Sequence, residues 1–371
     1  MNAMTGRTVF FLVFGGLVAC GSSETTPGTA DGATAPTDAA TAPADAAVQV
    51  DTAPSMDAAI LDSSEPAVDV VSPPDTTVAP PDASLVPDAT PVLDTSPPEE
   101  DTTTVDTGVP PTVPLEPGIA NISITQAIEG VDTERPVIVH APKTLQAGAT
   151  YPVVLFLHGA GGKGQSWVGK NMPHINQGLY VGVYPDGHLK KWNTGYQDTK
   201  ADDIAFVGMI VERLQGYQQL NLDRLFVVGS SNGAALAHDL AIKTDHFVGI
   251  TTIVTALTED SQPNAATQPV SVLQILGKKD NLCKYEGGKA PMGMTFLHAE
   301  DSAAVWAAHN GCSTPPEMTT TADGNTRIAY SGCTDGVRVL HYGITEAGHG
   351  MPQNIEGGLF PLFWAFFESL P

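Results

Sequence analysis

The chain has 371 residues, 42% of them hydrophobic, which is enough apolar material for a substantial folded core. Its formal charge is −24, from 41 acidic and 17 basic residues, but this charge is unevenly distributed. Residues 21–120 hold 18 Asp and Glu and no Lys or Arg, so removing them and Arg7 leaves 23 acids and 16 bases, near −7. A domain of that charge has no basic face to neutralise phosphates, which argues against nucleic acid as a partner.

The first twenty residues have the pattern of an export signal. Arg7 precedes an apolar run over 9–18, which is too short to remain in a membrane as a span. The run ends in LVAC at 17–20, which resembles the bacterial lipobox, where the cysteine is lipidated and becomes the new N-terminus. An ordinary secretory signal is the alternative. We therefore expect an exported lipoprotein held to a membrane through Cys20, at the outer membrane or cell surface, or released outside the cell.

Residues 21–117 repeat Asp, Ala, Pro, Thr and Val in loose order, with no bases and no periodic apolar face. Such a segment cannot bury enough apolar surface to offset its ordering entropy, so we expect it to be disordered. Proline and mutually repelling carboxylates favour extended conformations. The segment is predicted to be a spacer between membrane and domain; a specific acidic binding segment is the alternative.

The composition changes after Pro117, and residues 118–371 are predicted to form one folded domain. Apolar runs predict strands at 135–142, 151–159, 179–185, 224–229, 247–254, 270–277 and 337–344. Helices are predicted at 201–217, from about 233, at 299–310 and at 358–370. Strands that are apolar throughout and alternate with helices indicate an α/β fold, with a mainly parallel sheet covered by helices on both faces.

The most informative motif is Gly229-Ser230-Ser231-Asn232-Gly233, which lies directly between a predicted strand and a predicted helix. This is the G-x-S-x-G nucleophile elbow in the structural context that it requires. The glycines leave room for a strained turn, which lifts the serine above the edge of the sheet. The motif therefore predicts Ser231 as a nucleophile.

A serine hydroxyl is a poor nucleophile until a base removes its proton. In the α/β-hydrolase fold the base follows the acid along the chain. His349 fits because it lies in a loop just after the strand at 337–344. His341 lies inside that strand and His309 ends a helix, so packing explains both more simply.

The acid is expected in the loop after the strand at 270–277, where Asp280 lies. Its role would be to orient the histidine and stabilise the imidazolium without taking the proton itself. Glu286 is a rival a few residues further on. Asp301 is a second rival, but it lies at a helix start, where capping is the simpler explanation.

An oxyanion hole needs two backbone N–H groups directed at the tetrahedral intermediate. Asn232, which follows the nucleophile, is expected to supply one. The loop after the strand at 151–157 reads His158-Gly159-Ala160-Gly161-Gly162, and Ala160 is predicted to supply the other. His158 is expected to orient this loop rather than to act as a base.

Several short runs in chain order resemble the secreted polyhydroxybutyrate-depolymerase-like esterases, a group that also holds feruloyl and acetylxylan esterases. They are His158-Gly159, YPDG at 184–187, WNTG at 192–195, DDIAFVGMIVERL at 202–214, GSSNG at 229–233, Asp280 with YEGG at 285–288, WAAHNGC at 306–312 and AGHGMP at 347–352. The resemblance spans about 140–371. It implies an α/β-hydrolase fold with Ser231, Asp280 and His349 as the catalytic triad.

The same resemblance places Trp192 and Asn193 near the acyl cleft. Two departures from the family pattern bear on the substrate pocket. The acid strand ends in Leu276-Gly277 where relatives usually have His-Gly, and Gly350-Met351 follow the histidine where relatives often have a Trp. Neither departure removes a member of the triad, but either could reshape the pocket.

With Cys20 assigned to lipid, Cys283, Cys312 and Cys333 remain, and they allow three single pairings. The family resemblance favours Cys312–Cys333, a bond that would contribute roughly 3 kcal/mol by the loop-entropy argument. Cys283 would then be a packed free thiol. No group of residues has metal-ligand spacing, so we expect neither a metal nor another cofactor.

These observations predict a serine ester hydrolase that forms an acyl-serine intermediate, works as a monomer, and acts on feruloyl or acetyl esters of plant polysaccharide. A polyhydroxyalkanoate depolymerase is the alternative within the family. A surface-binding lipoprotein that keeps the fold without turnover is the alternative of another class.

Overall fold

The computed structural model describes residues 113–371, so the predicted export signal and most of the predicted spacer lie outside the described residues. The strands are β1 Gly118–Ile128, β2 Val131–Ala141, β3 Tyr151–Leu157, β4 Val181–Pro185, β5 Leu220–Ser230, β6 Gly249–Ile253, β7 Ser271–Gly277, β8 Gly288–Lys289, β9 Thr295–Phe296, β10 Glu317–Thr320, β11 Thr326–Tyr330 and β12 Val339–Ile344. The helices are α1 Gln165–Asn176, α2 Asp203–Gln215, α3 Asn232–Lys243, α4 Ala299–His309 and α5 Leu359–Glu368, with short 3₁₀ turns at His188–Lys190 and Thr334–Gly336. Within 113–371, no helix combines the length and the apolar character needed to span a membrane.

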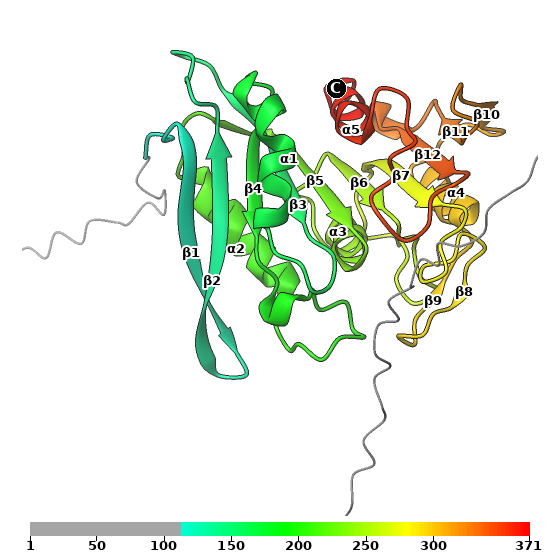
Figure 1. The fold of residues 1–371 in the computed structure, drawn as a ribbon, viewed down its shortest axis with the longest axis horizontal. Coiled ribbons are helices and arrows are strands. Elements are labelled where there is room, and N and C mark those ends of the chain that lie inside the picture. Colours follow the sequence, from blue (N-terminus) through cyan, green and yellow to red (C-terminus); the bar gives the residue numbers. More distant parts are fainter. Residues whose placement is uncertain (1–112) are drawn as a thin grey trace, which may run out of the picture. The chain divides into compact units, whose positions relative to one another are not determined.

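A ten-stranded sheet forms the centre of the domain, in the order β1-β2-β4-β3-β5-β6-β7-β12-β11-β10 (Figure 1). The six strands from β4 to β12 pair in parallel. The strands outside them, β1 and β2 at one edge and β11 and β10 at the other, pair antiparallel. Buried parallel strands at the centre agree with the continuous apolar runs in the sequence.

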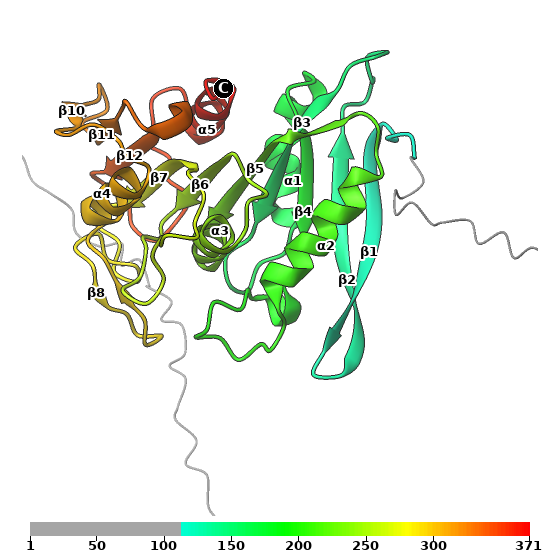
Figure 2. The same cartoon turned by 180° about the vertical axis from the view of Figure 1, so that it is seen from behind.

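Alternating side chains of each central strand build two cores, one on each face of the sheet. In β3, Val153, Leu155 and Leu157 pack on one face, while Val154 and Phe156 pack on the other. Buried side chains of α2, α3 and α4 cover the first face, and those of α1 and α5 cover the second (Figures 1 and 2). The predicted α/β-hydrolase fold class, a mainly parallel sheet with helices on both faces, is confirmed.

The last residues of the predicted spacer contact the domain. Leu115 is buried in the core that α2 and α3 cover, and its N–H donates to Gln219 Oε1 at 2.8 Å. Val113 forms a parallel bridge with Tyr217. A single leucine within an otherwise polar, proline-rich stretch therefore extends the packed chain a few residues before β1.

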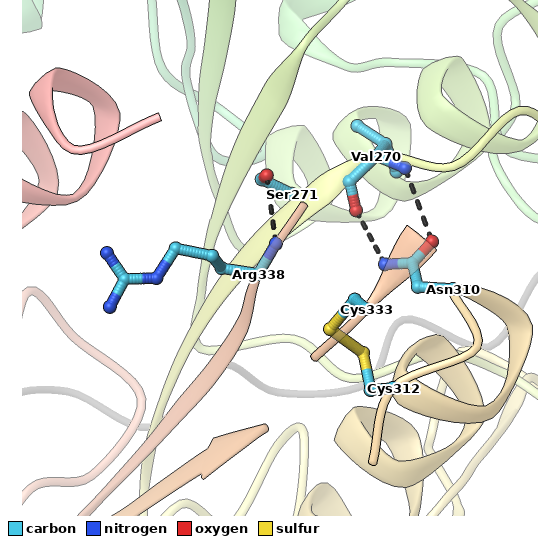
Figure 3. The surroundings of a disulfide bond; sticks show 6 residues. All are labelled: Val270, Ser271, Asn310, Cys312, Cys333 and Arg338. Carbon is cyan, nitrogen blue, oxygen red and sulfur yellow. Dashed lines mark hydrogen bonds between the residues drawn. A yellow bond between two sulfur atoms is a disulfide. The ribbon is translucent and has the colours of Figure 1, made fainter. Parts of the chain in front are cut away.

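A disulfide joins Cys312, just after α4, to Cys333, between β11 and β12 (Figure 3). It is the pair that the family resemblance implies. Beside it, Asn310 at the end of α4 donates from Nδ2 to the Val270 carbonyl at 2.7 Å and accepts from the Val270 N–H at 3.3 Å. These bonds fix the end of α4 to the start of β7, the strand that leads to Asp280.

Candidate active site

Ser231 lies in the tight turn between β5 and α3, where the motif predicts it. Its φ of 52° and ψ of −122° are strained for a residue with a side chain. A Cβ at Gly229 would lie 2.2 Å from the Gly233 carbonyl oxygen, and one at Gly233 would lie 2.4 Å from the Leu157 carbonyl oxygen. Only glycine fits these two positions, so the close approach of strand and helix enforces the turn that exposes the serine.

A continuous series of hydrogen bonds joins the three predicted triad residues. Ser231 Oγ lies 2.9 Å from His349 Nε2, and His349 Nδ1 lies 2.8 Å from Asp280 Oδ2. The histidine follows β12 and the aspartate follows β7, two adjacent parallel strands. The two loops are joined directly, since the Lys279 N–H donates to the Ala347 carbonyl at 2.9 Å.

The two ends of this series differ in solvent access. The His349 side chain is 22% exposed, whereas the Asp280 carboxylate is fully buried. Its second oxygen, Oδ1, accepts from the N–H groups of Leu282 and Cys283 at 2.8 and 2.9 Å. The carboxylate is thus held in one orientation, with Oδ2 directed at the imidazole, and this fixes the proton of the neutral ring on Nδ1.

His341, the main competitor for the base, is fully buried within β12. Its Nε2 lies 2.8 Å from the Tyr285 hydroxyl, and its Nδ1 accepts from Gln274 Nε2 at 2.9 Å. Burial lowers the pKa of His341 to about 3, so the ring is neutral at ordinary pH. It cannot reach Ser231, and its contacts explain it as a packing residue.

The other rivals also have structural partners. Glu286 hydrogen-bonds His298 Nε2 at 3.0 Å on the surface. Asp301 lies in the first turn of α4, where its charge favours the helix dipole. His309 ends the same helix and packs edge-on against Trp306, with ring centroids 6.2 Å apart.

Ala160 and Asn232 line the same pocket as Ser231. Neither backbone N–H donates to another atom of residues 113–371. The Asn232 side chain has a separate role, which sequence reasoning missed. It accepts from the Trp192 N–H at 2.7 Å and donates to the Trp192 carbonyl at 2.9 Å, so it fixes the neighbouring loop to the residue after the nucleophile.

Trp192 and Asn193 do not line the pocket at Ser231, but the Trp192 backbone is bonded to Asn232, which does; a role of either residue in substrate binding stays a prediction. The Trp192 side chain is fully buried, and its indole Nε1 donates to the His158 carbonyl at 2.8 Å. Asn193 Nδ2 donates to the Ala201 carbonyl at 2.9 Å. A large indole with its one polar atom hydrogen-bonded is most stable in the core, so Trp192 supports the loop that carries Ala160 from within.

His158 is buried and holds the loop that carries Ala160, as predicted. Its Nε2 accepts from the Gly187 N–H at 3.0 Å, and its Nδ1 lies 2.8 Å from the Gly159 carbonyl oxygen. This pairing places the ring proton on Nδ1. Burial lowers the pKa of His158, so the ring stays neutral.

A buried ion pair lies behind this loop. Arg135 on β2 and Asp203 at the start of α2 approach within 2.7 Å, and the guanidinium lies 3.5 Å from the centre of the Phe206 ring. Burial lowers the pKa of Arg135 and raises that of Asp203, while their mutual attraction opposes both shifts. Asp203 Oδ2 also accepts from the Asn193 N–H at 2.6 Å, so the pair anchors the segment that carries Trp192.

A pocket of about 400 Å³ opens at Ser231. One side is apolar and comes from the segment around β8 and β9; its residues are Leu282, Cys283, Met292, Met294 and Phe296. The loops after β3 and β4 contribute a more polar set of lining residues: Ala160, Lys191, Tyr196, Gln197 and Asp198.

Cys283 is a buried free thiol, three residues after the acid. Burial and the nearby Asp280 raise its pKa to about 12, so it is a protonated packing group. Among residues 113–371, no three His, Cys, Asp or Glu side chains are grouped to hold a metal ion.

The fold and this series of side chains define an α/β-hydrolase with the arrangement of the serine hydrolases. No protein-family model matches the chain. Over 231 residues it is 24% identical to feruloyl esterase B of Piromyces equi, covering 58% of this chain and 42% of that protein. Over 235 residues it is 27% identical to the putative esterase NocK of Nocardia uniformis subsp. tsuyamanensis, covering 57% and 67%.

A third relative is the probable feruloyl esterase C of Aspergillus niger, 24% identical over 243 residues and covering 62% of this chain and 82% of that one. A solved acetyl xylan esterase from Aspergillus awamori aligns with a TM-score of 0.49 and 15% identity, covering 67% and 99%. The chain spans less than half the length of the Piromyces protein. Over most of its folded domain, the chain is therefore similar in sequence to proteins named feruloyl esterases and to a putative esterase.

Proposed function

We propose that this chain is a serine carboxylic ester hydrolase that acts on feruloyl or acetyl esters of plant polysaccharide. The observation that carries the proposal is the unbroken series of hydrogen bonds from Ser231 Oγ through His349 to the buried Asp280. The substrate class is supported by relatives that are named feruloyl esterases.

In the proposed reaction, His349 Nε2 takes the Ser231 proton as Oγ attacks the ester carbonyl. Asp280 holds the Nδ1–H and stabilises the imidazolium that forms. The free N–H groups of Ala160 and Asn232 hold the oxyanion of the tetrahedral intermediate. The imidazolium then protonates the departing alcohol, which leaves the acyl group on Ser231.

Water completes the cycle. It attacks the acyl-serine while His349 accepts its proton, and the second tetrahedral intermediate then releases the acid as the imidazolium returns a proton to Ser231 Oγ. The series of residues needs no further group for these proton transfers.

The two sets of lining residues suit the two parts of such an ester. The apolar side, with Met292, Met294 and Phe296, would contact an aromatic or short acyl group. The more polar lining residues, among them Lys191, Gln197 and Asp198, would contact the alcohol.

The test is hydrolysis of methyl ferulate, acetylated xylan and hydroxybutyrate oligomers by the folded domain and by Ser231→Ala. The oligomers are included because the family resemblance also spans polyhydroxybutyrate depolymerases. We expect Ser231→Ala to lose at least about 10³-fold in kcat. Ser230→Ala is the matched control, since it removes the neighbouring hydroxyl of the same turn. Equal, slow rates for wild type and Ser231→Ala would favour a non-catalytic binding protein.

We also propose that the enzyme is exported and held to a membrane by lipid on Cys20, with residues 21–117 as a spacer. The LVAC run at 17–20 and the acidic, base-free, proline-rich composition of 21–117 support this. Cys20→Ala should lose incorporation of labelled fatty acid; labelling equal to wild type would contradict the assignment.

A further inference from the structure

A second pocket, of about 390 Å³, lies beside the catalytic pocket along α3. Tyr196, Ala235 and Met294 line both pockets, so the two form neighbouring parts of one groove. Because an α-helix rises about 1.5 Å per residue, a group opposite Asp239 would lie roughly 12 Å along the helix from Ser231. No step of the proposed reaction uses this second pocket.

The second pocket combines an apolar lining, which includes Ala235, Leu257 and Met294, with hydroxyl groups, carboxylates and one ammonium. The polar groups belong to Thr194, Asp239, Lys243, Thr258, Asp260 and Ser261. Several of these groups already form an ion pair or a hydrogen bond with each other. Lys243 Nζ lies 3.0 Å from Asp239 Oδ2, and the Ser261 hydroxyl donates to Asp239 Oδ1 at 2.6 Å.

The charge balance of the second pocket, two carboxylates to one ammonium, disfavours an anionic ligand. Two carboxylates, Asp239 and Asp260, face one ammonium, that of Lys243. His238, at the buried side, adds no positive charge, because burial lowers its pKa to about 4. A mixture of donors and acceptors without excess positive charge fits a ligand rich in hydroxyl groups.

Tyr196 connects the two pockets. Its hydroxyl donates to Asp260 Oδ2, which joins the segment after β4 to the segment after β6. The Tyr196 residue is 36% exposed, so its ring can present an apolar face to a ligand that extends from one pocket into the other.

We propose that the second pocket binds a sugar residue of the alcohol part of the substrate, beyond the sugar that carries the ester. This inference rests on the proposed ester hydrolase function. The apolar side of the catalytic pocket suits the acyl group, whereas the hydroxyl and carboxylate groups along α3 suit a carbohydrate chain. Asp260 and Lys243 would hydrogen-bond sugar hydroxyls, and the Tyr196 ring would pack against a sugar face.

The experiment compares two substrates with the same acyl group, methyl ferulate and a feruloylated arabinoxylan oligosaccharide. The pocket variants are Asp260→Leu and Lys243→Leu. Glu259→Leu is the matched control, because Glu259 is an exposed neighbouring acid that does not line the pocket. Asp260→Leu should raise KM for the oligosaccharide ester about 10-fold, the loss expected for a hydrogen bond to a charged group. Lys243→Leu, which leaves the Tyr196 contact intact, should act in the same direction.

The internal reference is the ratio of kcat/KM for the oligosaccharide ester to that for methyl ferulate. A fall of this ratio in both pocket variants but not in Glu259→Leu supports the proposal. Weaker inhibition of methyl ferulate hydrolysis by the deacylated oligosaccharide in Asp260→Leu would support it independently. An unchanged ratio in both pocket variants, or an equal fall in Glu259→Leu, overturns the sugar subsite while leaving the esterase intact. If wild type hydrolyses neither ester, the proposed function itself fails.

Discussion

His349 and His341 lie in one short stretch of chain, yet their surroundings are opposite. His341 is inside β12, fully buried between Tyr285 and Gln274. His349 lies in the loop after the same strand, partly exposed, between Asp280 and Ser231. In open α/β sheets, ligands meet the protein at the carboxyl ends of the strands. The position of an imidazole relative to the strand end therefore decides its role. Beyond the strand end it can exchange protons with a substrate, whereas inside the strand it only hydrogen-bonds buried polar groups.

Changing His349 should have the largest effect, and on turnover. His349→Gln removes the proposed base while keeping a polar side chain at a partly exposed position. We expect kcat/KM for methyl ferulate to fall on the order of 10⁴-fold. The free energy of unfolding should change by less than about 1 kcal/mol, because the Gln amide can still donate to the buried Asp280 Oδ2. A loss below tenfold would show that another group serves as the base.

Changing His341 should have the next largest effect, and on stability. His341→Leu leaves one Gln274 N–H without a partner in the core and removes one of the two hydrogen bonds of the Tyr285 hydroxyl, which still donates to Glu300 Oε1. Buried polar groups that lose a partner cost about 1–3 kcal/mol each, so we expect a loss of about 3 kcal/mol. Denaturant unfolding measures this loss, and kcat per folded molecule should stay near wild type. A variant that unfolds like wild type but turns over slowly would contradict the comparison.

The sequence predicted the central strands and the nucleophile elbow because both depend on local patterns. Continuous apolar runs mark buried parallel strands, and the glycines at 229 and 233 mark a turn that no other residue fits. The position of His349 and Asp280 after two strands then followed from the chain order of this fold. All three catalytic side chains directly follow strands, and the apolar pattern of the sequence predicts where those strands end.

Elements stabilised by long-range contacts were harder to predict. The α1 helix contains Gly169 and Pro173 and packs through Trp167, so its helical pattern is weak. The β10 strand is exposed along its whole length and has no apolar alternation. The family resemblance placed Trp192 near the acyl cleft, but it did not predict that Asn232 holds its backbone or that its indole is buried. No local pattern reveals a contact between residues 40 positions apart.

The smallest of the three effects is the pH dependence of the His341 contribution. The pKa of His341 falls from 6.5 to about 3 on folding because burial disfavours the charged ring. Below pH 6.5 the unfolded chain therefore binds a proton that the folded chain does not. This difference in proton binding lowers the free energy of unfolding progressively as the pH falls from 6.5 toward 3, and it costs nothing above pH 6.5.

Between pH 6.5 and pH 5 this loss amounts to about 2 kcal/mol, at about 1.36 kcal/mol per pH unit. Other groups titrate over the same range, so the useful quantity is the difference in unfolding free energy between wild type and His341→Leu. That difference should narrow from about 3 kcal/mol at pH 7.5 to about 1 kcal/mol at pH 5. His246→Asn, at a partly exposed site on another part of the domain, is the control and should cause little change at either pH. A difference that stays constant with pH would mean that His341 binds a proton as readily in the folded as in the unfolded chain. The ring would then not be the neutral core group that its contacts with Tyr285 and Gln274 indicate.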